Sequence, residues 1–173
     1  MTGKNKSAGK KKAGSGPDGV ENGKTVAQNR KARHNYFIEE VIEAGIVLTG
    51  TEVKSLRGGQ ASINESYATV KAGEIFLLNA YIPEYTKSNA KWQHEVRQPR
   101  KLLLHKNEMT KLVAAVQRKG VTLIPLSIYF NKRGIAKVGL GIAGGKKQQD
   151  KREDLKKRDW QREKSRIMRE KNR

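Results

Sequence analysis

The clearest alternation of apolar and polar positions lies between residues 121 and 142. Every second residue from Ala136 to Ile142 is apolar, and Lys137 and two glycines stand between them, which is the period of a strand with one buried face. Lys137 is therefore expected to point outward. Residues 121–130 form the preceding strand by residue type, and residues 131–134 join the two strands as a hairpin.

Shorter runs of β-branched, aromatic and aliphatic residues predict further strands earlier in the chain. They cover residues 36–38, 41–42, 46–48, 67–70, 75–78 and 101–104. Residues 71–74 separate two of these runs, and Gly73 supplies the positive φ that a tight turn requires. This segment is predicted to be a β-hairpin.

Two helices are predicted among these strands. Apolar residues recur at i, i+3, i+4 and i+7 after Asn107, which is expected to cap the helix, and Gly120 closes its end. The members of this stripe are Met109, Leu112, Val113 and Val116. A shorter helix is predicted between Gly50 and Gly58 as a plug. About six or seven short strands with one or two helices predict a mainly β fold, a small closed or partly open antiparallel barrel over residues 29–142.

The two ends of the chain lack the apolar residues of a core. Residues 1–28 are rich in Gly, Lys, Ser and Asn and are expected to form a disordered basic arm. Residues 143–173 form a basic tail that is expected to be disordered when free, because its few large apolar side chains cannot offset the entropy of ordering. Asp150 and Glu153 have capping-box spacing, so the tail is expected to become helical on a partner.

Charge indicates the class of that partner. The net charge of +20 divides as +4 over residues 1–28, +9 over residues 29–142 and +7 over residues 143–173. A basic body with basic ends favours nucleic acid. No apolar run approaches the ~20 residues of a membrane span, no secretory leader is visible, and cysteine is absent. The expectation is a cytoplasmic protein that binds a polyanion and no membrane.

Two basic stretches are candidate contacts. The first is the lead-in to the first strand, with Arg30, Lys31, Arg33 and His34, which also reads as a solvated charge run without an apolar stripe for a helix. The second runs from residue 83 to residue 100 and interleaves basic and aromatic residues. It suits phosphate contact with base stacking, and equally a long surface loop with a few anchors. Its members are Lys87, Lys91, His94, Arg97 and Arg100, beside Tyr81, Tyr85 and Trp92.

Little in the sequence indicates a catalytic site or a metal site. The three histidines have no ligand spacing, and no catalytic set is visible, so neither a metal nor a cofactor is expected. The sequence Gly139-Leu-Gly-Ile-Ala-Gly144 matches G-x-G-x-x-G, but no apolar-faced helix follows it. A nucleotide-dependent enzyme therefore rests on this decoy alone.

Several stretches together are distinctive. They are Asn29-Arg-Lys-Ala-Arg-His34-Asn-Tyr-Phe-Ile-Glu-Glu40, Glu43-Ala-Gly45, Gly50-Thr-Glu-Val-Lys-Ser-Leu-Arg57, Arg100-Lys-Leu-Leu-Leu-His105 and Gly145-Lys-Lys-Gln-Gln-Asp-Lys-Arg152. In this order the chain resembles the bacterial SsrA-binding protein family, small protein B, from about Asn29 to Met168. The resemblance implies an OB-like barrel, a monomer without catalysis, which binds the tRNA-like domain of transfer-messenger RNA. It implies delivery of that RNA, with elongation factor Tu and GTP, to stalled ribosomes for trans-translation.

The resemblance also implies site residues. Asn29, Glu43 and Lys137 match positions of the RNA-binding face, and all three are expected at the surface. Glu43 is expected to accept hydrogen bonds from base edges or hydroxyls, or to orient a neighbouring basic side chain. The tail matches the segment that enters the decoding region of the small ribosomal subunit and the empty message channel. Its matching residues are Gly145, Lys146, Lys147, Gln149, Asp150, Lys151, Arg152, Trp160, Ile167 and Met168.

Two residues depart from the family pattern, and one other function is open. Gly144 stands where the family usually has a basic residue, and Gln149 stands where it often has His or Tyr, which argues against a base stack there. Without the resemblance, the alternative is a structural ribosomal protein with an OB-like body and basic extensions. Such a component would stay on ribosomes through a high-salt wash at about one copy each.

Overall fold

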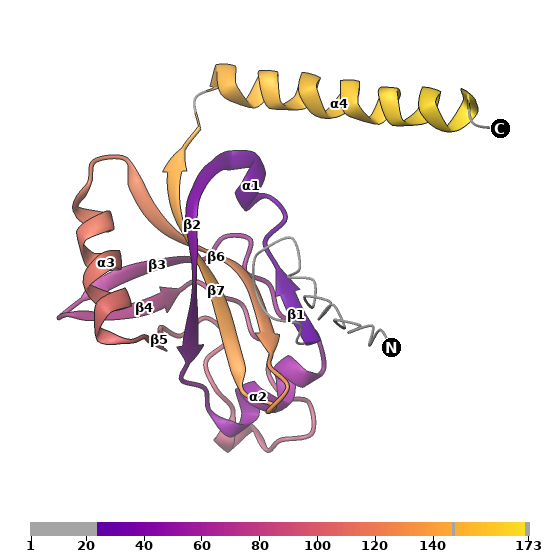
Figure 1. Ribbon diagram of the computed structural model, residues 1–173. Coiled ribbons are helices and arrows are strands. Elements are labelled where there is room, and N and C mark those ends of the chain that lie inside the picture. Colours follow the sequence, from indigo (N-terminus) through magenta and orange to yellow (C-terminus); the bar gives the residue numbers. More distant parts are fainter. Residues whose placement is uncertain (1–23, 147, 172–173) are drawn as a thin grey trace, which may run out of the picture.

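The computed structural model describes residues 24–146 and 148–171. The elements are β1 (Lys24–Gln28), α1 (Ala32–Asn35), β2 (Tyr36–Ile46), α2 (Gly50–Arg57), β3 (Tyr67–Lys71), β4 (Glu74–Leu78), the 3₁₀ helix η1 (Ala90–Trp92), β5 (Arg100–Leu103), α3 (Lys106–Gln117), β6 (Val121–Phe130), β7 (Ala136–Gly145) and α4 (Gln148–Lys171). Figure 1 shows strands at the centre, α2 at one end of them, α3 at the side, and α4 projecting beyond the opposite end.

The described strands form one antiparallel sheet in the order β1-β6-β3-β4-β5-β2-β7. Because β6 also pairs with β7, the sheet closes into a barrel, and β1 and β3 share the other edge of β6. The prediction of a mainly β, OB-like antiparallel barrel is confirmed. Local hairpins build much of it, and the turn between β3 and β4 has positive φ at both Ala72 and Gly73.

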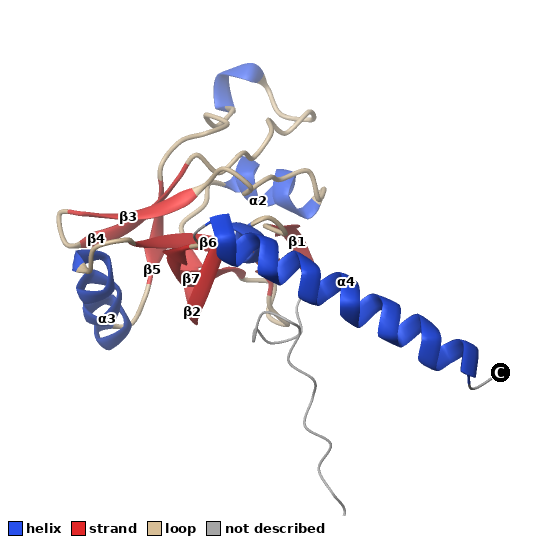
Figure 2. Ribbon diagram, turned by 90° about the horizontal axis from the view of Figure 1, so that it is seen from above, coloured by secondary structure: helices blue, strands red, loops and turns tan. Residues whose placement is uncertain are grey.

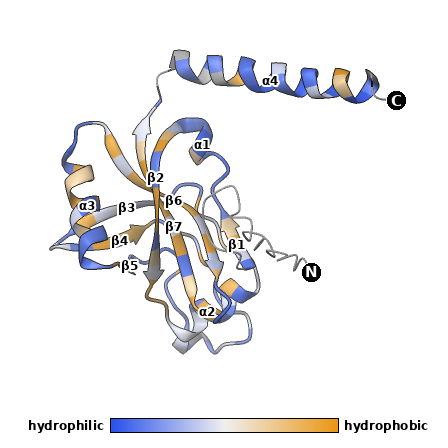
Figure 3. Cartoon of the chain, in the orientation of Figure 1, coloured by the Kyte–Doolittle hydropathy of each residue, from blue (hydrophilic) through white to orange (hydrophobic). Residues whose placement is uncertain are grey.

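The barrel core follows the predicted alternation. Val138, Leu140 and Ile142 of β7 are buried, while Lys137 between them is partly exposed. Leu112 of α3 and Leu56 of α2 are both fully buried, so the predicted stripe and the predicted plug helix contribute to the core. Burying one such leucine contributes about 1.5–3 kcal/mol. Figure 3 shows hydrophobic stretches along the barrel strands and on α3, whereas α4 is largely hydrophilic.

A second, smaller apolar cluster lies on the outer side of the sheet. Ala32 of α1 packs there with Ile124, Leu126 and Ala143, opposite to the barrel core. Gly141 permits the close packing, because a Cβ on it would lie 3.3 Å from side-chain atoms of both Ile38 and Leu126. This cluster therefore holds α1 against the outer face of β2, β6 and β7.

A buried ion pair joins α2 to β5. The Glu52 carboxylate accepts hydrogen bonds from Arg100 Nε at 2.7 Å, from Gln98 Nε2 at 2.8 Å and from the Thr49 backbone N–H at 2.7 Å. Both charged side chains are 1% exposed. Burial raises the pKa of Glu52, but these three hydrogen bonds and the Arg100 charge outweigh it, so the pKa lies below its ordinary value of 4.5. The remaining Arg100 N–H groups donate to the carbonyls of Ala80, Glu95, Val96 and Gln98.

Several predicted boundaries need correction. Residues 24–28, assigned to the disordered arm, form β1 on the edge of β6, and residues 1–23 lie outside the described part. Strand β7 continues to Gly145, three residues past the predicted end of the barrel, because Gly144 and Gly145 pair with Phe37 and Tyr36. A single strand, β2, replaces the predicted runs 36–38 and 41–42 and ends at Ile46, the first residue of the predicted run 46–48. A register shift after Ile38 accommodates the extra residue.

Helices α3 and α1 also differ from the predictions, and the G-x-G-x-x-G sequence lies in a strand. Helix α3 begins at Lys106 rather than after Asn107, because His105 is the cap and its N–H donates to Glu108 at 2.9 Å. Residues 32–35 form the short helix α1, which the absence of an apolar stripe did not favour. The G-x-G-x-x-G sequence lies wholly inside β7, between antiparallel neighbours, so it forms no phosphate-binding turn.

The buried pair predicts a pH-dependent stability. Glu52→Gln is expected to lower the free energy of unfolding at pH 7 by about 3–5 kcal/mol, because it leaves the Arg100 charge buried without its partner. The lowered pKa means that the folded state binds fewer protons than the unfolded chain. The wild-type contribution is therefore present above pH 4.5 and is lost as the pH falls through the folded pKa.

Chemical unfolding at several pH values tests this expectation. The gap between wild type and Glu52→Gln should shrink below pH 4.5. Glu74→Gln is the matched control, because Glu74 pairs with Lys101 but is 44% exposed, and it should cost less than about 1 kcal/mol. Equal effects of the two substitutions would contradict the role of the buried pair.

Candidate nucleic-acid interface

The outer face of the β2–β7–β6 sheet carries a polar cluster. Lys137 Nζ lies 3.1 Å from Glu43 Oε1, and the Tyr129 hydroxyl donates to Glu43 Oε2. Lys137 pairs directly with Gly45 of β2 and with Tyr129 of β6, which brings the three side chains together across neighbouring strands. Glu43 thus lies beside a basic side chain, as one of the two roles expected for it requires. The Lys137 side chain is 26% exposed and keeps access to solvent.

The basic lead-in lies on the same outer face. Arg30, Lys31 and Arg33 are exposed, and His34 is half-buried with its Nδ1 atom 3.1 Å from Asn35 Oδ1. Lys137 and Ala143 project from the same side of β7, and Ala143 packs against α1. Six residues of strand span about 20 Å, so the lead-in and the Glu43–Lys137 pair mark the two ends of one surface.

Asn29 does not belong to that surface. It is 5% exposed, its backbone N–H donates to Leu126 O at 2.8 Å, and its Nδ2 donates to Ile63 O at 3.2 Å. Its Oδ1 accepts a hydrogen bond from Ala32 N at 3.0 Å, which satisfies the first turn of α1. The expectation of a surface Asn29 is wrong, and its position is structural: it fixes α1 on the sheet.

The second candidate stretch, residues 83–100, also contains both buried and exposed basic residues. Arg100 is buried against Glu52, and His94 is 7% exposed, with hydrogen bonds to Thr51 Oγ1 and Ile82 O. Both are anchors of the long loop rather than phosphate contacts. Lys87, Lys91 and Arg97 stay exposed, and Trp92 is 73% exposed.

The tail leaves the barrel beside the lead-in. Gly145 pairs with Tyr36, the Lys146 backbone N–H donates to Asn35 O at 3.2 Å, and Lys146 Nζ donates to Arg33 O at 3.1 Å. The structure therefore brings together two groups of predicted residues, the lead-in and the first residues of the tail. The backbone contacts to Lys146 were not visible in the sequence, because they join residues more than a hundred positions apart.

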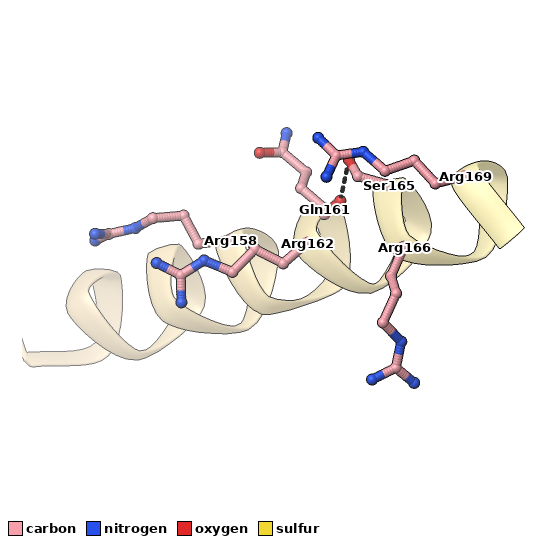
Figure 4. Close-up of a pocket in the computed structure, with 6 residues that line it drawn as sticks. All are labelled: Arg158, Gln161, Arg162, Ser165, Arg166 and Arg169. Atoms are coloured by element: carbon pink, nitrogen blue, oxygen red, sulfur yellow. Dashed lines mark hydrogen bonds between the residues drawn. The ribbon is translucent and has the colours of Figure 1, made fainter.

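Helix α4 has two different sides. Trp160 and Ile167 lie two turns apart on one side, with Lys164 Nζ 5.1 Å from the Trp160 ring centroid. Arginines gather on the other side, around an open hollow shown in Figure 4. They are Arg158, Arg162, Arg166 and Arg169, with Gln161 and Ser165 alongside. Every side chain of α4 that the structure describes is exposed, and Figure 2 shows the helix extending away from the barrel.

The predicted tail residues fall into three groups. Asp150, Arg152, Trp160, Ile167 and Met168 are exposed on α4. Lys147 and the side chains of Gln149 and Lys151 lie outside the described part. Gly145 and Lys146 belong to the junction with the barrel.

Residues 24–146 and 148–171 contain no group of three His, Cys, Asp or Glu side chains that could hold a metal ion. No described helix has the length and apolar character needed to span a membrane.

Comparison with known proteins connects this geometry to a family. The family model described as "SmpB protein" matches residues 26–170. The "SsrA-binding protein" of Paramagnetospirillum magneticum is 60% identical over 149 residues, which are 86% of this chain and 97% of the relative. That of Bradyrhizobium diazoefficiens is 61% identical over 146 residues, which are 84% and 92%. The solved structure "tmRNA-SmpB: a journey to the center of the bacterial ribosome" has a chain with a TM-score of 0.60 and 53% identity, covering 70% of this chain and 84% of that chain.

Burial separates the three predicted surface residues in a mutational test. Asn29→Ala is expected to lower the free energy of unfolding by about 1–3 kcal/mol, because buried partners at Ala32 and Ile63 lose their hydrogen bonds. Lys137→Ala and Glu43→Ala should leave the melting temperature close to that of the wild type and weaken RNA binding.

Thermal unfolding and filter binding to the tRNA-like RNA measure the two effects. Lys101→Ala is the matched control, since it also removes a lysine paired with a glutamate, on β5. If Lys137→Ala and Lys101→Ala both bind the RNA with the affinity of the wild type, Lys137 does not belong to the interface.

Proposed function

The chain belongs to the SmpB protein family, and from this membership we propose that it is an RNA-binding adaptor that binds transfer-messenger RNA and acts in trans-translation on the ribosome. The observation that carries the proposal is the outer sheet face. It combines the exposed lead-in cations, the Glu43–Lys137 pair and the start of a basic tail on one side of the barrel.

The division of labour on this face follows from chemistry. Arg30, Lys31 and Arg33 supply phosphate contacts, which give affinity and orientation without sequence information. Lys137, held by Glu43, supplies a cation whose direction is set before RNA arrives. The carboxylate oxygens of Glu43 accept further hydrogen bonds from base amino groups or from 2′-hydroxyls. The 2′-hydroxyls distinguish RNA from DNA.

The same proposal covers the part of the RNA that is bound, the other partners and the state of the protein in the cell. The RNA target is the tRNA-like domain, and delivery takes place in a complex with elongation factor Tu and GTP. The protein acts as a cytoplasmic monomer without catalytic activity. The tail binds the small-subunit decoding region and the empty message channel.

The chemistry of α4 supports a tail that is stabilised by a partner. Its described side chains bury nothing against the barrel, and its internal pairs, such as Arg162–Asp159 at 3.8 Å, are highly exposed and contribute little. An arginine side suits the phosphates of ribosomal RNA, because the guanidinium group binds them in a bidentate manner. The Trp160 and Ile167 side suits an apolar or base-stacking surface. We infer that this helix is fully stable only when both sides are covered.

Salt dependence tests the electrostatic part of the proposal. If about five phosphates are neutralised, log K for the tRNA-like RNA should fall with log[salt] at a slope of about −3.5 to −4.5. Arg30→Gln should reduce the steepness by about 0.7–0.9, because one phosphate contact is lost. Lys101→Gln, the same kind of change on β5, should leave the slope unaltered. A nearly flat dependence for the wild type would rule out the proposed mode of binding.

Truncation and a double substitution test the tail. Removal of all residues after Gly145 should leave the melting temperature unchanged, lower RNA affinity only slightly because the first charges of the tail are lost, and abolish tagging of stalled peptides. Ile167→Glu with Met168→Glu should also abolish tagging, because it places one charge on the side of α4 that carries Trp160 and a second charge beside that side. Ile167→Leu with Met168→Leu keeps that side apolar and should retain tagging. Full tagging by the glutamate variant would contradict a packed helical tail.

A further inference from the structure

Two adjoining hollows open beside α1, between the lead-in and the long loop. One has a volume of about 280 Å³ and includes Tyr67, and the other has a volume of about 380 Å³ and includes Tyr81 and Arg97. Lys31, Asn64 and Glu65 line both of them. The two hollows therefore adjoin along these three residues, and together they are called the tyrosine groove, with a tyrosine in each hollow and a shared polar wall between them.

Both ends of the tyrosine groove present flat surfaces to solvent. Tyr67 is 47% exposed and Tyr81 is 39% exposed, so both rings are accessible to a ligand. The Arg97 guanidinium carbon lies 5.7 Å from the centroid of the Tyr81 ring, and Arg97 Nη1 donates to Asn79 Oδ1 at 2.5 Å. The guanidinium plane is thus held in place before any ligand binds.

The backbone around the second end is also fixed. Arg100 donates to the carbonyls of Ala80 and Val96, the residues immediately before Tyr81 and Arg97. Tyr81 also exchanges two backbone hydrogen bonds of 2.9 Å with Ser62, near the wall of the groove. The stacking surfaces at this end therefore require no reordering on binding, which favours affinity.

We propose that the tyrosine groove binds two consecutive unpaired nucleotides of the RNA. One base stacks on Tyr67 and the next on the Arg97–Tyr81 pair, while the Lys31 ammonium group contacts the phosphate between them and Asn64 bonds to base edges. Aromatic rings and arginine planes are the usual platforms for unstacked bases. A base-paired helix cannot enter, because its base faces are already stacked.

The composition of the groove favours RNA over other occupants. An apolar peptide would cover the exposed side chains of Asn64 and Lys31 without bonding to them, whereas a nucleotide offers acceptors and a phosphate to these side chains. The shared wall of the groove also includes Lys31, a residue of the lead-in, so an RNA strand bound on the outer sheet face reaches the groove without leaving the protein. The proposal rests on the proposed function and adds a site for unpaired nucleotides to it.

Substitutions that change the flat surfaces but not the charge test this site. Tyr67→Ala is expected to weaken binding of the full chain to the tRNA-like RNA about tenfold, the effect of one lost base stack, while Tyr67→Phe keeps the ring and should bind as the wild type does. Arg97→Lys keeps the charge and loses the plane, so affinity should fall severalfold at an unchanged salt slope. Arg118→Lys is the matched control. Arg118 is an exposed arginine at the end of α3 that pairs with Glu39 at 3.0 Å.

Two further measurements locate the bound nucleotides. Chemical probing of 2′-hydroxyl reactivity should show two adjacent unpaired nucleotides protected by the wild type and by Arg118→Lys, and exposed again with Tyr67→Ala and Arg97→Lys. Binding of an unstructured RNA hexamer should show the same order of variants. All variants are checked for the melting temperature of the wild type, and Tyr67→Phe guards against a folding defect at that position.

The outcomes separate this site from the proposed function. If the wild type binds the tRNA-like RNA and Tyr67→Ala and Arg97→Lys bind as well as Arg118→Lys, the groove is overturned and the proposed function stands. If the wild type binds the hexamer through Tyr67 and Arg97 but not the tRNA-like RNA, the groove holds and the proposed target is wrong. Binding of neither RNA overturns both.

Discussion

The hydrogen-bonded ion pair of Glu52 and Arg100 is the interaction on which the arrangement of this barrel depends. Arginine has five N–H donors, and all five find acceptors here: the Glu52 carboxylate and four backbone carbonyls. Lysine has three donors without a fixed plane and could not replace it. Because a buried charge without its partner costs several kcal/mol, helix α2, strand β5 and the loop before it keep a single arrangement.

That arrangement decides which basic residues remain available for RNA. Arg100 is buried in the core and fixes the backbone next to Tyr81 and Arg97. By residue type it is a candidate phosphate contact, but in the structure it positions other candidate contacts. Lys137 is intermediate, because its pair with Glu43 is partly exposed and open to a further ligand. The lead-in cations are exposed. A net charge of +20 therefore overstates the binding surface, and burial identifies the charges that are free to act.

Local patterns predicted most of the fold, and long-range pairing accounts for the rest. The strand from Ala136, the stripe after His105 and the plug helix follow from spacing alone, because their periods are complete within a few residues. Strand β1 has one buried side chain, Ala27, and is a strand only because β6 has a free edge. Asn29 and Arg100 are polar by type, so their burial could be inferred only from partners 34 and 48 residues away.

The members of the candidate site could be named from the sequence, but not their arrangement. The alternation predicted that Lys137 points outward, the resemblance assigned it to the RNA-binding face, and the charge run indicated the lead-in. Only the strand register places them on one face. The same register ends at Gly145, and Lys146 bonds to α1, so the tail is anchored beside the lead-in. Helix α4 starts two residues later, and two residues span at most about 7 Å. This is within a Debye length of about 8 Å, so an RNA phosphate at α1 also interacts with the first charges of the tail. The barrel face and the tail therefore act as one electrostatic surface at this junction, and binding at one part raises the effective concentration of RNA at the other.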